Sequence, residues 1–251
     1  NEILVNARDQ IVRLKGNSDD NIIQVSNIKI NFNEDNSITI LNDGNGIVVK
    51  KHEKEKIYIP QLIFGELLTS SNYKKDEKKI VGGKNGYGAK LTNIFSELFT
   101  ITTVDHINGI KYTQTWEKNM TKCNKPNIRK YSNKPFTEIS WDLDFKRFGI
   151  EKYSDEMISL MYRRVYDIAG ITDKKVNVYL NDKKIKIKSF VDYVKLYIGD
   201  KKYIHEKISD RWEVVLTTSD NDTFEQLSFV NGICTSKGGS HVDFITKLIT
   251  K

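Results

Sequence analysis

The sequence predicts an α/β fold, in which helices and strands are stacked in layers. Segments with helical periodicity follow short segments with strand periodicity along the whole chain. A long polar, glycine-rich segment, residues 69–88, is inserted between two of the predicted helices. Hydrophobic residues make up 38% and charged residues 29% of the chain, the composition of a polar globular protein and not of a disordered one. The 251 residues are enough for one large domain or two smaller ones.

The first predicted element is an amphipathic helix over residues 2–15. Its apolar stripe, at helical spacing, consists of Leu4, Ala7, Ile11 and Leu14. A second, polar face carries Glu2, Asn6, Asp9 and Arg13. No N-cap residue precedes the stripe, so we expect the sequence to begin inside a longer protein.

Strands and helices then alternate up to a hairpin turn at Asn181 and Asp182. The predicted strands are residues 22–25, 28–32, 37–41, 99–104, 110–116, 136–141 and 175–180. The predicted helices are residues 60–68, with Pro60 in the first turn, residues 88–98 and residues 155–169. Helix 88–98 is inferred from the spacing of Leu91, Ile94, Phe95 and Leu98. The buried face of helix 155–169 is expected to consist of Met157, Leu160, Met161, Val165 and Ile168.

A domain boundary is expected near residues 199–208, where the polar string from Gly199 to Lys202 interrupts the pattern. Beyond it, residues 212–217 and 226–230 are predicted to pair as strands. Residues 240–250 predict a helix whose inward side chains are Val242, Ile245, Leu248 and Ile249. We therefore divide the chain into a first domain, residues 1–200, and the beginning of a second, residues 201–251.

Composition excludes several classes of protein. No run of 18 apolar residues occurs, so no transmembrane helix is expected. The two cysteines, Cys123 and Cys234, are too few for a disulfide framework and indicate a reducing compartment. The histidines are too dispersed for a structural zinc site. The net charge of +7 fits acidic partners such as nucleotide or nucleic acid, and equally a surface that lysine keeps soluble.

Two polar residues of the first helix, Glu2 and Asn6, are a candidate catalytic pair. At a spacing of four residues their side chains emerge side by side. A carboxylate there can accept a proton from an attacking water. An amide oxygen can bind Mg²⁺, which prefers hard oxygen ligands. A solvated helix face explains the same spacing, so this pair needs support from elsewhere in the chain.

A glycine-containing turn, Asn-Asp-Gly-Asn-Gly-Ile, follows the strand at residues 37–41 and begins at Asn42. Its glycines, Gly44 and Gly46, let the backbone pass close to a flat ligand. A polar side chain at the strand end can accept a hydrogen bond from an adenine amino group. Asn-Asp-Gly is also a common turn string, so an ordinary turn remains an alternative.

The glycine-rich segment predicts an anion site most directly. Backbone N–H groups are exposed by Gly82, Gly83, Gly86 and Gly88, and the next helix points its N-terminus at the enclosed space. Positive charge comes from Lys84 and Lys90, and hydrogen bonds to ribose or phosphate from Ser70, Ser71 and Asn72. The alternative is a flexible surface loop. The segment is not a P-loop, which ends in Gly-Lys-Ser/Thr, nor a Rossmann fingerprint, which needs a small residue where Leu91 stands.

Taken in order, these segments resemble the GHKL ATPase superfamily, and most closely its eukaryotic-type type IIA DNA topoisomerases. The resemblance is carried by Glu2–Ala7, Asn42–Gly46, Leu67–Tyr73, Gly83–Lys90, Arg163–Asp167, Phe229–Gly232 and Lys237–Gly239. It covers nearly the whole chain. It implies a Bergerat-type ATP-binding fold, an α/β (α+β) two-layer sandwich whose mixed sheet is covered by helices. Residues 201–251 would then begin a transducer domain of the ribosomal S5 domain 2-like α/β type.

The resemblance also implies a ligand, Mg-ATP, and a role for each motif residue. Glu2 would be the general base that activates water, and Asn6 would bind the Mg²⁺ ion. Asn42 would contact adenine, and Thr137 would line the adenine pocket. Ribose and phosphate would be held by Ser70, Ser71 and Asn72. The residues expected to wrap the triphosphate are Gly83, Lys84, Asn85, Gly86, Tyr87, Gly88, Ala89 and Lys90.

Two residues depart from the family pattern. Lys84 replaces a common arginine, which is not equivalent at a bidentate site, and Val48 replaces a proline. The family's N-terminal arm, its transducer Gln-Thr-Lys loop and its DNA-cleaving tyrosine are not in the sequence. We therefore expect this chain to bind nucleotide better than it hydrolyses it.

The activity implied by the resemblance is that of an ATP-dependent type IIA DNA topoisomerase. Mg-ATP would drive dimerisation of this region and so capture a DNA segment for double-strand passage. The expected partners are double-stranded DNA and a second copy of the chain, without a membrane. The expected location is the nucleus for a cellular enzyme, or host cytoplasm or virion for an enzyme of a large DNA virus.

Three alternative functions are compatible with parts of the pattern. They are another GHKL ATPase such as a mismatch-repair enzyme, a non-catalytic module that dimerises on binding nucleotide, and a plain basic DNA-binding domain. The string Tyr87-Gly88-Ala89-Lys90 and the segment Arg163–Asp167 argue against the first, and the presence of Glu2 argues against the second.

Overall fold

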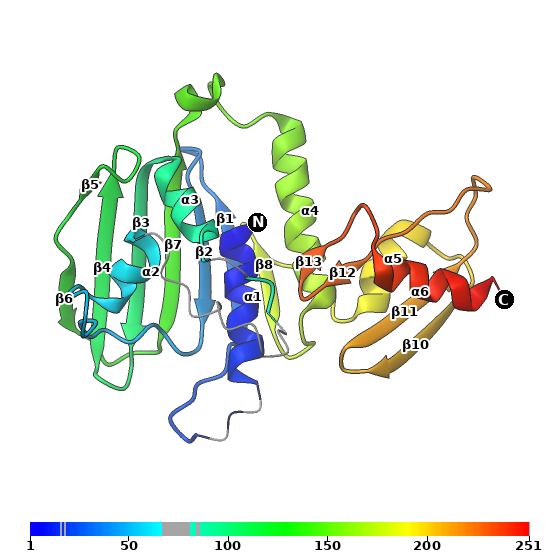
Figure 1. Cartoon of the computed structure of the whole chain (residues 1–251), viewed down its shortest axis with the longest axis horizontal. Coiled ribbons are helices and arrows are strands. Elements are labelled where there is room, and N and C mark those ends of the chain that lie inside the picture. The colour runs from blue at the N-terminus through cyan, green and yellow to red at the C-terminus, as the bar shows by residue number, and fades with distance from the viewer. Residues whose placement is uncertain (16, 18, 67–80, 84–85, 251) are drawn as a thin grey trace.

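The computed structural model describes residues 1–15, 17, 19–66, 81–83 and 86–250. Figure 1 shows a large sheet with helices in front of it, and a smaller group of elements that ends at the C-terminus. The architecture is mixed α/β, as the sequence predicts. None of the described helices is long and apolar enough to cross a membrane.

The large sheet, formed by the chain before α5, has nine strands among the described residues. They are β1 (Asn27–Phe32), β2 (Ile38–Asp43), β3 (Ser96–Asp105), β4 (Ile110–Glu117), β5 (Lys122–Cys123), β6 (Asn127–Lys130), β7 (Phe136–Leu143), β8 (Asn177–Leu180) and β9 (Lys183–Lys184). The order is β5-β4-β3-β7-β2-β1-β8-β9, with β6 also beside β4. The pair β1–β8 is parallel and the others are antiparallel, so the sheet is mixed.

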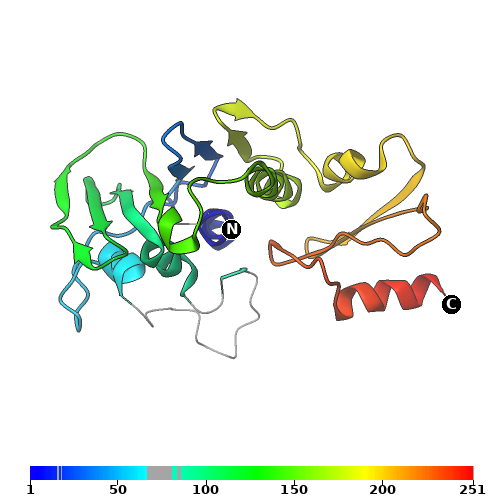
Figure 2. The same ribbon diagram turned by 90° about the horizontal axis from the view of Figure 1, so that it is seen from above.

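Helices cover one face of this sheet. In Figure 1, α1 (Glu2–Leu14), α2 (Ile59–Gly65) and α3 (Gly88–Ile94) lie in front of the strands, and α4 (Asp155–Ile171) stands beside them. The view from above in Figure 2 shows the same helices gathered on one side. The apolar stripe predicted for α1 is buried in one core cluster with strand residues such as Ile28, Ile40 and Ile101. Burial of these apolar side chains holds the two layers together.

The C-terminal region contains α5 (Phe190–Ile198), β10 (Tyr203–Ser209), β11 (Trp212–Thr217), β12 (Phe229–Val230), β13 (Ile233–Cys234) and α6 (Ser240–Ile249). A short 3-10 helix, η2 (Phe145–Phe148), precedes α4 in the first part. The strands form two separate two-stranded ladders, β10–β11 and β12–β13. Among the described residues, no apolar side chain after Tyr193 is buried.

Two sequence predictions in the sheet region are wrong in detail. Residues 22–25 form no strand, because the backbone N–H of Ile23 donates to Asn45 Oδ1 instead of joining a ladder. The helix predicted to end at residue 98 ends at Ile94, and β3 begins at Ser96. The apolar spacing used for that prediction spans the junction, so Leu91 is 47% exposed and Leu98 belongs to the strand.

The predicted burial of α4 is also wrong at its first turns. Val165 and Ile168 are buried, but Met157 and Leu160 are exposed. Figure 1 shows the reason, because the start of α4 rises above the sheet and its end packs beside α5.

The C-terminal region differs most from expectation. Residues 226–230 do not pair with residues 212–217, since β11 pairs with β10 and β12 pairs with β13. The strand β10 lies in the segment expected to be a boundary, and α5 is an unpredicted helix. In α6, Leu248 and Ile249 are exposed, because no described element covers that face.

Candidate functional site

The first turn of α1 lies against the first turn of α3. A Cβ atom at position 88 would lie 2.2 Å from Glu2 Oε2 and 2.5 Å from Glu2 Cγ. Only glycine therefore fits at position 88 while the Glu2 carboxylate keeps this place. The sequence-predicted acid and the glycine that opens the helix are brought together across 86 positions of the chain.

The Asn6 side chain lies one helical turn after Glu2 and is half-buried. Among the described residues, no hydrogen bond to this side chain is formed. The spacing predicted from the helix period is thus present in space. Its assignment to Mg²⁺ stays a prediction.

Asn42 and Thr137 are partners in the antiparallel ladder, where β2 ends and β7 begins. The Asn42 side chain is buried, and its Nδ2 donates to the Asp43 carbonyl at 3.1 Å. The Thr137 hydroxyl is 2.9 Å from the hydroxyl of Thr103, which also accepts from the Ile47 N–H at 2.8 Å. Neighbouring ends of β2, β7 and β3 therefore hold Asn42 and Thr137, the two residues predicted to contact adenine, side by side. Thr103 was not singled out by the sequence.

The turn after Asn42 is held close to the sheet. A Cβ atom at Gly46 would lie 2.0 Å from the Val104 carbonyl oxygen, so the backbones touch there. Gly44 has a φ of +89°, a conformation that favours glycine. The Asp43 carboxylate accepts from the Ser26 and Asn27 N–H groups at 2.6 and 2.8 Å. Asp43 is therefore committed to the fold, and contact of Asn42 with a ligand stays a prediction.

The glycine-rich segment is attached to α1 and to its own helix. The N–H groups of Gly82 and Gly83 each donate to the Asp9 carboxylate at 3.0 Å. Gly86 has a φ of +69°, and its carbonyl accepts from Lys90 Nζ at 3.0 Å. Lys90 is 2% exposed, and burial lowers the pKa of its ammonium group although Glu66 opposes the shift. Lys90 thus closes the turn before α3, and contact with a ligand phosphate stays a prediction.

Five predicted site residues lie outside the described residues: Ser70, Ser71, Asn72, Lys84 and Asn85. Of the remaining loop residues, Tyr87 is the N-cap of α3 and Ala89 is buried in the core. Asp9 is the residue that sequence reasoning placed wrongly, on the solvated face of the first helix. It is buried, and its carboxylate accepts the N–H groups of Gly82 and Gly83; these partners lie 73 and 74 positions away, so no local signal could have revealed the burial.

The arrangement suits an anionic ligand next to a carboxylate. Backbone N–H groups at the start of α3 favour negative charge. Glu2 lies at the same place and can accept a proton there. In the described part of the chain, no three His, Cys, Asp or Glu side chains lie close enough together to hold a metal ion. A Mg²⁺ ion bound through Asn6 would therefore need oxygen ligands from the nucleotide and from water.

No family model matches the sequence. The chain is 47% identical over 270 residues to DNA topoisomerase 2 of Candida glabrata, covering 100% of this chain and 19% of that protein. It is 44% identical over 260 residues to DNA topoisomerase 2-alpha of Homo sapiens, covering 100% of this chain and 16% of that protein. The chain thus spans less than a fifth of the length of these two curated relatives.

Two solved structures of topoisomerase II have the same fold as this chain. The ATPase region of Saccharomyces cerevisiae topoisomerase II superimposes with a TM-score of 0.91 at 46% identity, covering 99% of this chain and 64% of that one. The ATPase and transducer domains of DNA topoisomerase II from Balamuthia mandrillaris give a TM-score of 0.90 at 40% identity, covering 99% and 62%.

Proposed function

Because the chain is homologous along its full length to the ATPase region of eukaryotic DNA topoisomerase II, we propose that it binds and hydrolyses Mg-ATP as the gate of such an enzyme. The observation that carries the proposal is the contact between the Glu2 carboxylate and Gly88 at the start of α3. It joins a proton acceptor to a site for negative charge, and these are the two parts that hydrolysis of a phosphoanhydride needs.

In this proposal Glu2 accepts a proton from the water that attacks the terminal phosphate. Asn6 binds Mg²⁺, whose charge would offset that of the phosphate oxygens. Asn42 and Thr137 hold adenine at the ends of β2 and β7. The glycine loop from Gly83 to Lys90 binds the triphosphate, and Ser70, Ser71 and Asn72 hold ribose and phosphate. The protein's own contribution is mostly positioning and electrostatics.

The proposal extends to the protein that carries this chain. Mg-ATP would join two copies through this region, and the dimer would capture double-stranded DNA for strand passage in the nucleus. Residues 201–251 would begin the transducer domain, since the comparison with an ATPase-plus-transducer structure covers 99% of the chain. The comparisons do not favour a mismatch-repair ATPase or a non-catalytic module.

Calorimetry and turnover together test the function. We expect heat on titration of the chain with a non-hydrolysable ATP analogue in Mg²⁺, and none without nucleotide. Glu2→Gln should keep that binding and lower the hydrolysis rate by about 10²–10⁴-fold, the usual size of a general-base effect. Glu34→Gln, in the β1–β2 turn, is the matched control and should keep both. Absence of binding by the unaltered chain would refute the proposal, and unchanged turnover would remove Glu2 from its role.

A further inference from the structure

The buried carboxylate of Asp9 belongs to the same helix as Glu2 and Asn6 but plays a different part. It is fully buried on α1 and accepts N–H groups from Gly82 and Gly83, both at 3.0 Å. Arg8 Nη1 is 3.5 Å from Asp9 Oδ1. The two bonds from the glycine N–H groups to the carboxylate are charge-assisted and stronger than neutral ones. The start of the glycine loop is therefore fixed to α1, seven residues after the proposed base.

Gly82 also touches the C-terminal region. A Cβ atom on Gly82 would lie 2.8 Å from Val5 Cγ1, 2.9 Å from the Asn231 carbonyl oxygen and 3.2 Å from Ile233 Cγ1. Gly82 thus fills a narrow space between α1 and the β12–β13 hairpin, residues 229–234. Figure 1 shows this hairpin at the inner end of the C-terminal group, next to α4.

The same turn of α1 supports the tip of the hairpin. Gly232 has a φ of +84°, and a Cβ atom there would lie 3.2 Å from Arg8 Cδ and 3.3 Å from Arg8 Cζ. Neighbouring residues of one helix, Arg8 and Asp9, therefore hold the hairpin and the loop respectively. A rigid helix with these two contacts couples the loop to the hairpin without a direct link to any ligand.

We propose that Asp9 is a positioning residue that, with Gly82, joins the phosphate-binding loop to the β12–β13 hairpin. The inference rests on the proposed function, because it takes the loop to bind phosphates. A ligand bound by the loop then also restrains the hairpin, through the backbone of Gly82 and Gly83. The C-terminal region then responds to the state of the nucleotide site through the β12–β13 hairpin.

The first test needs no nucleotide. Asp9→Asn replaces one acceptor oxygen with a donor that faces an N–H group. We expect amide exchange, followed by NMR, to become about tenfold faster or more at Gly82, at Gly83 and in the hairpin, while the β2–β7 ladder keeps its rates. Asp144→Asn is the matched control, because Asp144 is also buried and accepts the Arg147 N–H at the far end of β7. Faster exchange at the two glycines with an unchanged hairpin would overturn the inference, as would uniform loosening of the whole sheet.

The second test uses Gly82→Ala, which serves also if Asp9→Asn does not fold. In the unaltered chain, a non-hydrolysable ATP analogue with Mg²⁺ should slow hairpin exchange severalfold. Because a Cβ at position 82 would meet the Asn231 carbonyl oxygen at 2.9 Å, the hairpin of the variant should lose this response even when the analogue saturates the protein. If the unaltered chain binds no analogue, the proposed function fails. If it binds and the hairpin does not respond, only the present inference fails.

Discussion

The sheet region (α1 to β9) and the C-terminal region (α5 to α6) both contain strands rich in apolar residues, but only those of the sheet region are buried. Phe99, Ile101 and Val104 of β3 are fully buried, whereas β10 is exposed at every residue, with Ile204 63% and Ile208 69% exposed. Both strands have the apolar and β-branched residues that favour strand structure. The difference teaches that such residues are enough to form a strand, but a second layer is needed to form a core.

The two regions meet at a buried polar cluster between α4 and α5. The Tyr193 hydroxyl donates to Asp167 Oδ1 at 2.5 Å, and Arg164 Nη1 donates to Asp167 Oδ2 at 2.7 Å. Burial raises the pKa of the Tyr193 phenol, and the bond to Asp167 raises it further. The Tyr193 ring is also 5.9 Å from that of Phe229 in β12. Tyr193 is thus the last buried residue of the core and a contact of the exposed region.

The largest expected effect comes from truncating matched isoleucines in the two regions. Ile101→Ala should lower the free energy of unfolding by about 2–5 kcal/mol, because it leaves a cavity in a close-packed core. Ile208→Ala should change it by no more than about 0.5 kcal/mol, as at other exposed sites. Urea unfolding monitored by circular dichroism measures both. Equal losses would show that β10 is packed in solution and would break the comparison.

The junction should give an intermediate effect. Tyr193→Phe removes a donor to the buried Asp167 carboxylate and should cost about 1–3 kcal/mol of unfolding free energy. Tyr203→Phe, in exposed β10, is the control and should be nearly neutral. The same urea titrations compare them. A neutral Tyr193→Phe would mean that apolar contacts alone hold α5 to α4.

A smaller effect is expected from pH. Burial alone would raise the pKa of Asp105, but hydrogen bonds from Asn108 and from the Val49 N–H hold it below its usual range. A carboxyl whose pKa is lower in the folded state stabilises the fold above its unfolded pKa of about 3.9, and this is lost as pH falls through the folded value. Asp105→Asn should therefore flatten the decline of stability below about pH 4. Thermal unfolding between pH 2 and 6 would measure it, with Asp210→Asn in the exposed β10–β11 turn as the control; an unchanged decline would contradict the assignment.

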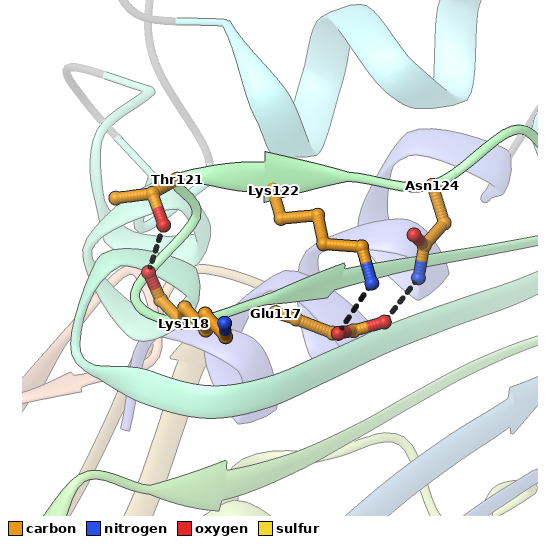
Figure 3. Close-up of polar contacts among 5 residues, drawn as sticks. All are labelled: Glu117, Lys118, Thr121, Lys122 and Asn124. Atoms are coloured by element: carbon orange, nitrogen blue, oxygen red, sulfur yellow. Dashed lines mark hydrogen bonds and ion pairs between the residues drawn. The ribbon is translucent and has the colours of Figure 1, made fainter.

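The smallest effect concerns the exposed hairpin of β4 and β5, shown in Figure 3. Glu117 accepts from Lys122 Nζ at 2.8 Å and from Asn124 Nδ2 at 2.5 Å, and these bonds lower the pKa of its carboxyl. Lys122→Gln should move that pKa back toward the usual value, as seen by NMR titration, without a measurable change in stability. Lys118→Gln should shift the pKa in the same direction but by less, because the charge of Lys118 lowers it without a hydrogen bond. An unmoved pKa in Lys122→Gln would contradict the assignment of the shift to Lys122.

Much of the local structure could be predicted from the sequence. The 3.6-residue stripe of α1, the Pro60 start of α2 and the alternation in β1 and β2 are local signals, and each element appears. The short β12–β13 ladder and the exposed start of α4 could not be predicted, because both depend on neighbours distant in the chain. The structure gives the positions of those predicted site residues that it describes, and their roles stay predictions.

By itself, the sequence determined most of the helices and strands of the sheet region, and the order of an acid, an amide and a glycine loop along the chain. These follow from periodicity and from glycine's conformational freedom, which act over a few residues. Only the tertiary structure decided that Gly88 meets Glu2, that Asn42 faces Thr137, and that Asp9 turns inward to hold Gly82 and Gly83. Such contacts join residues 73 or more positions apart, and the packing of the layers determines them.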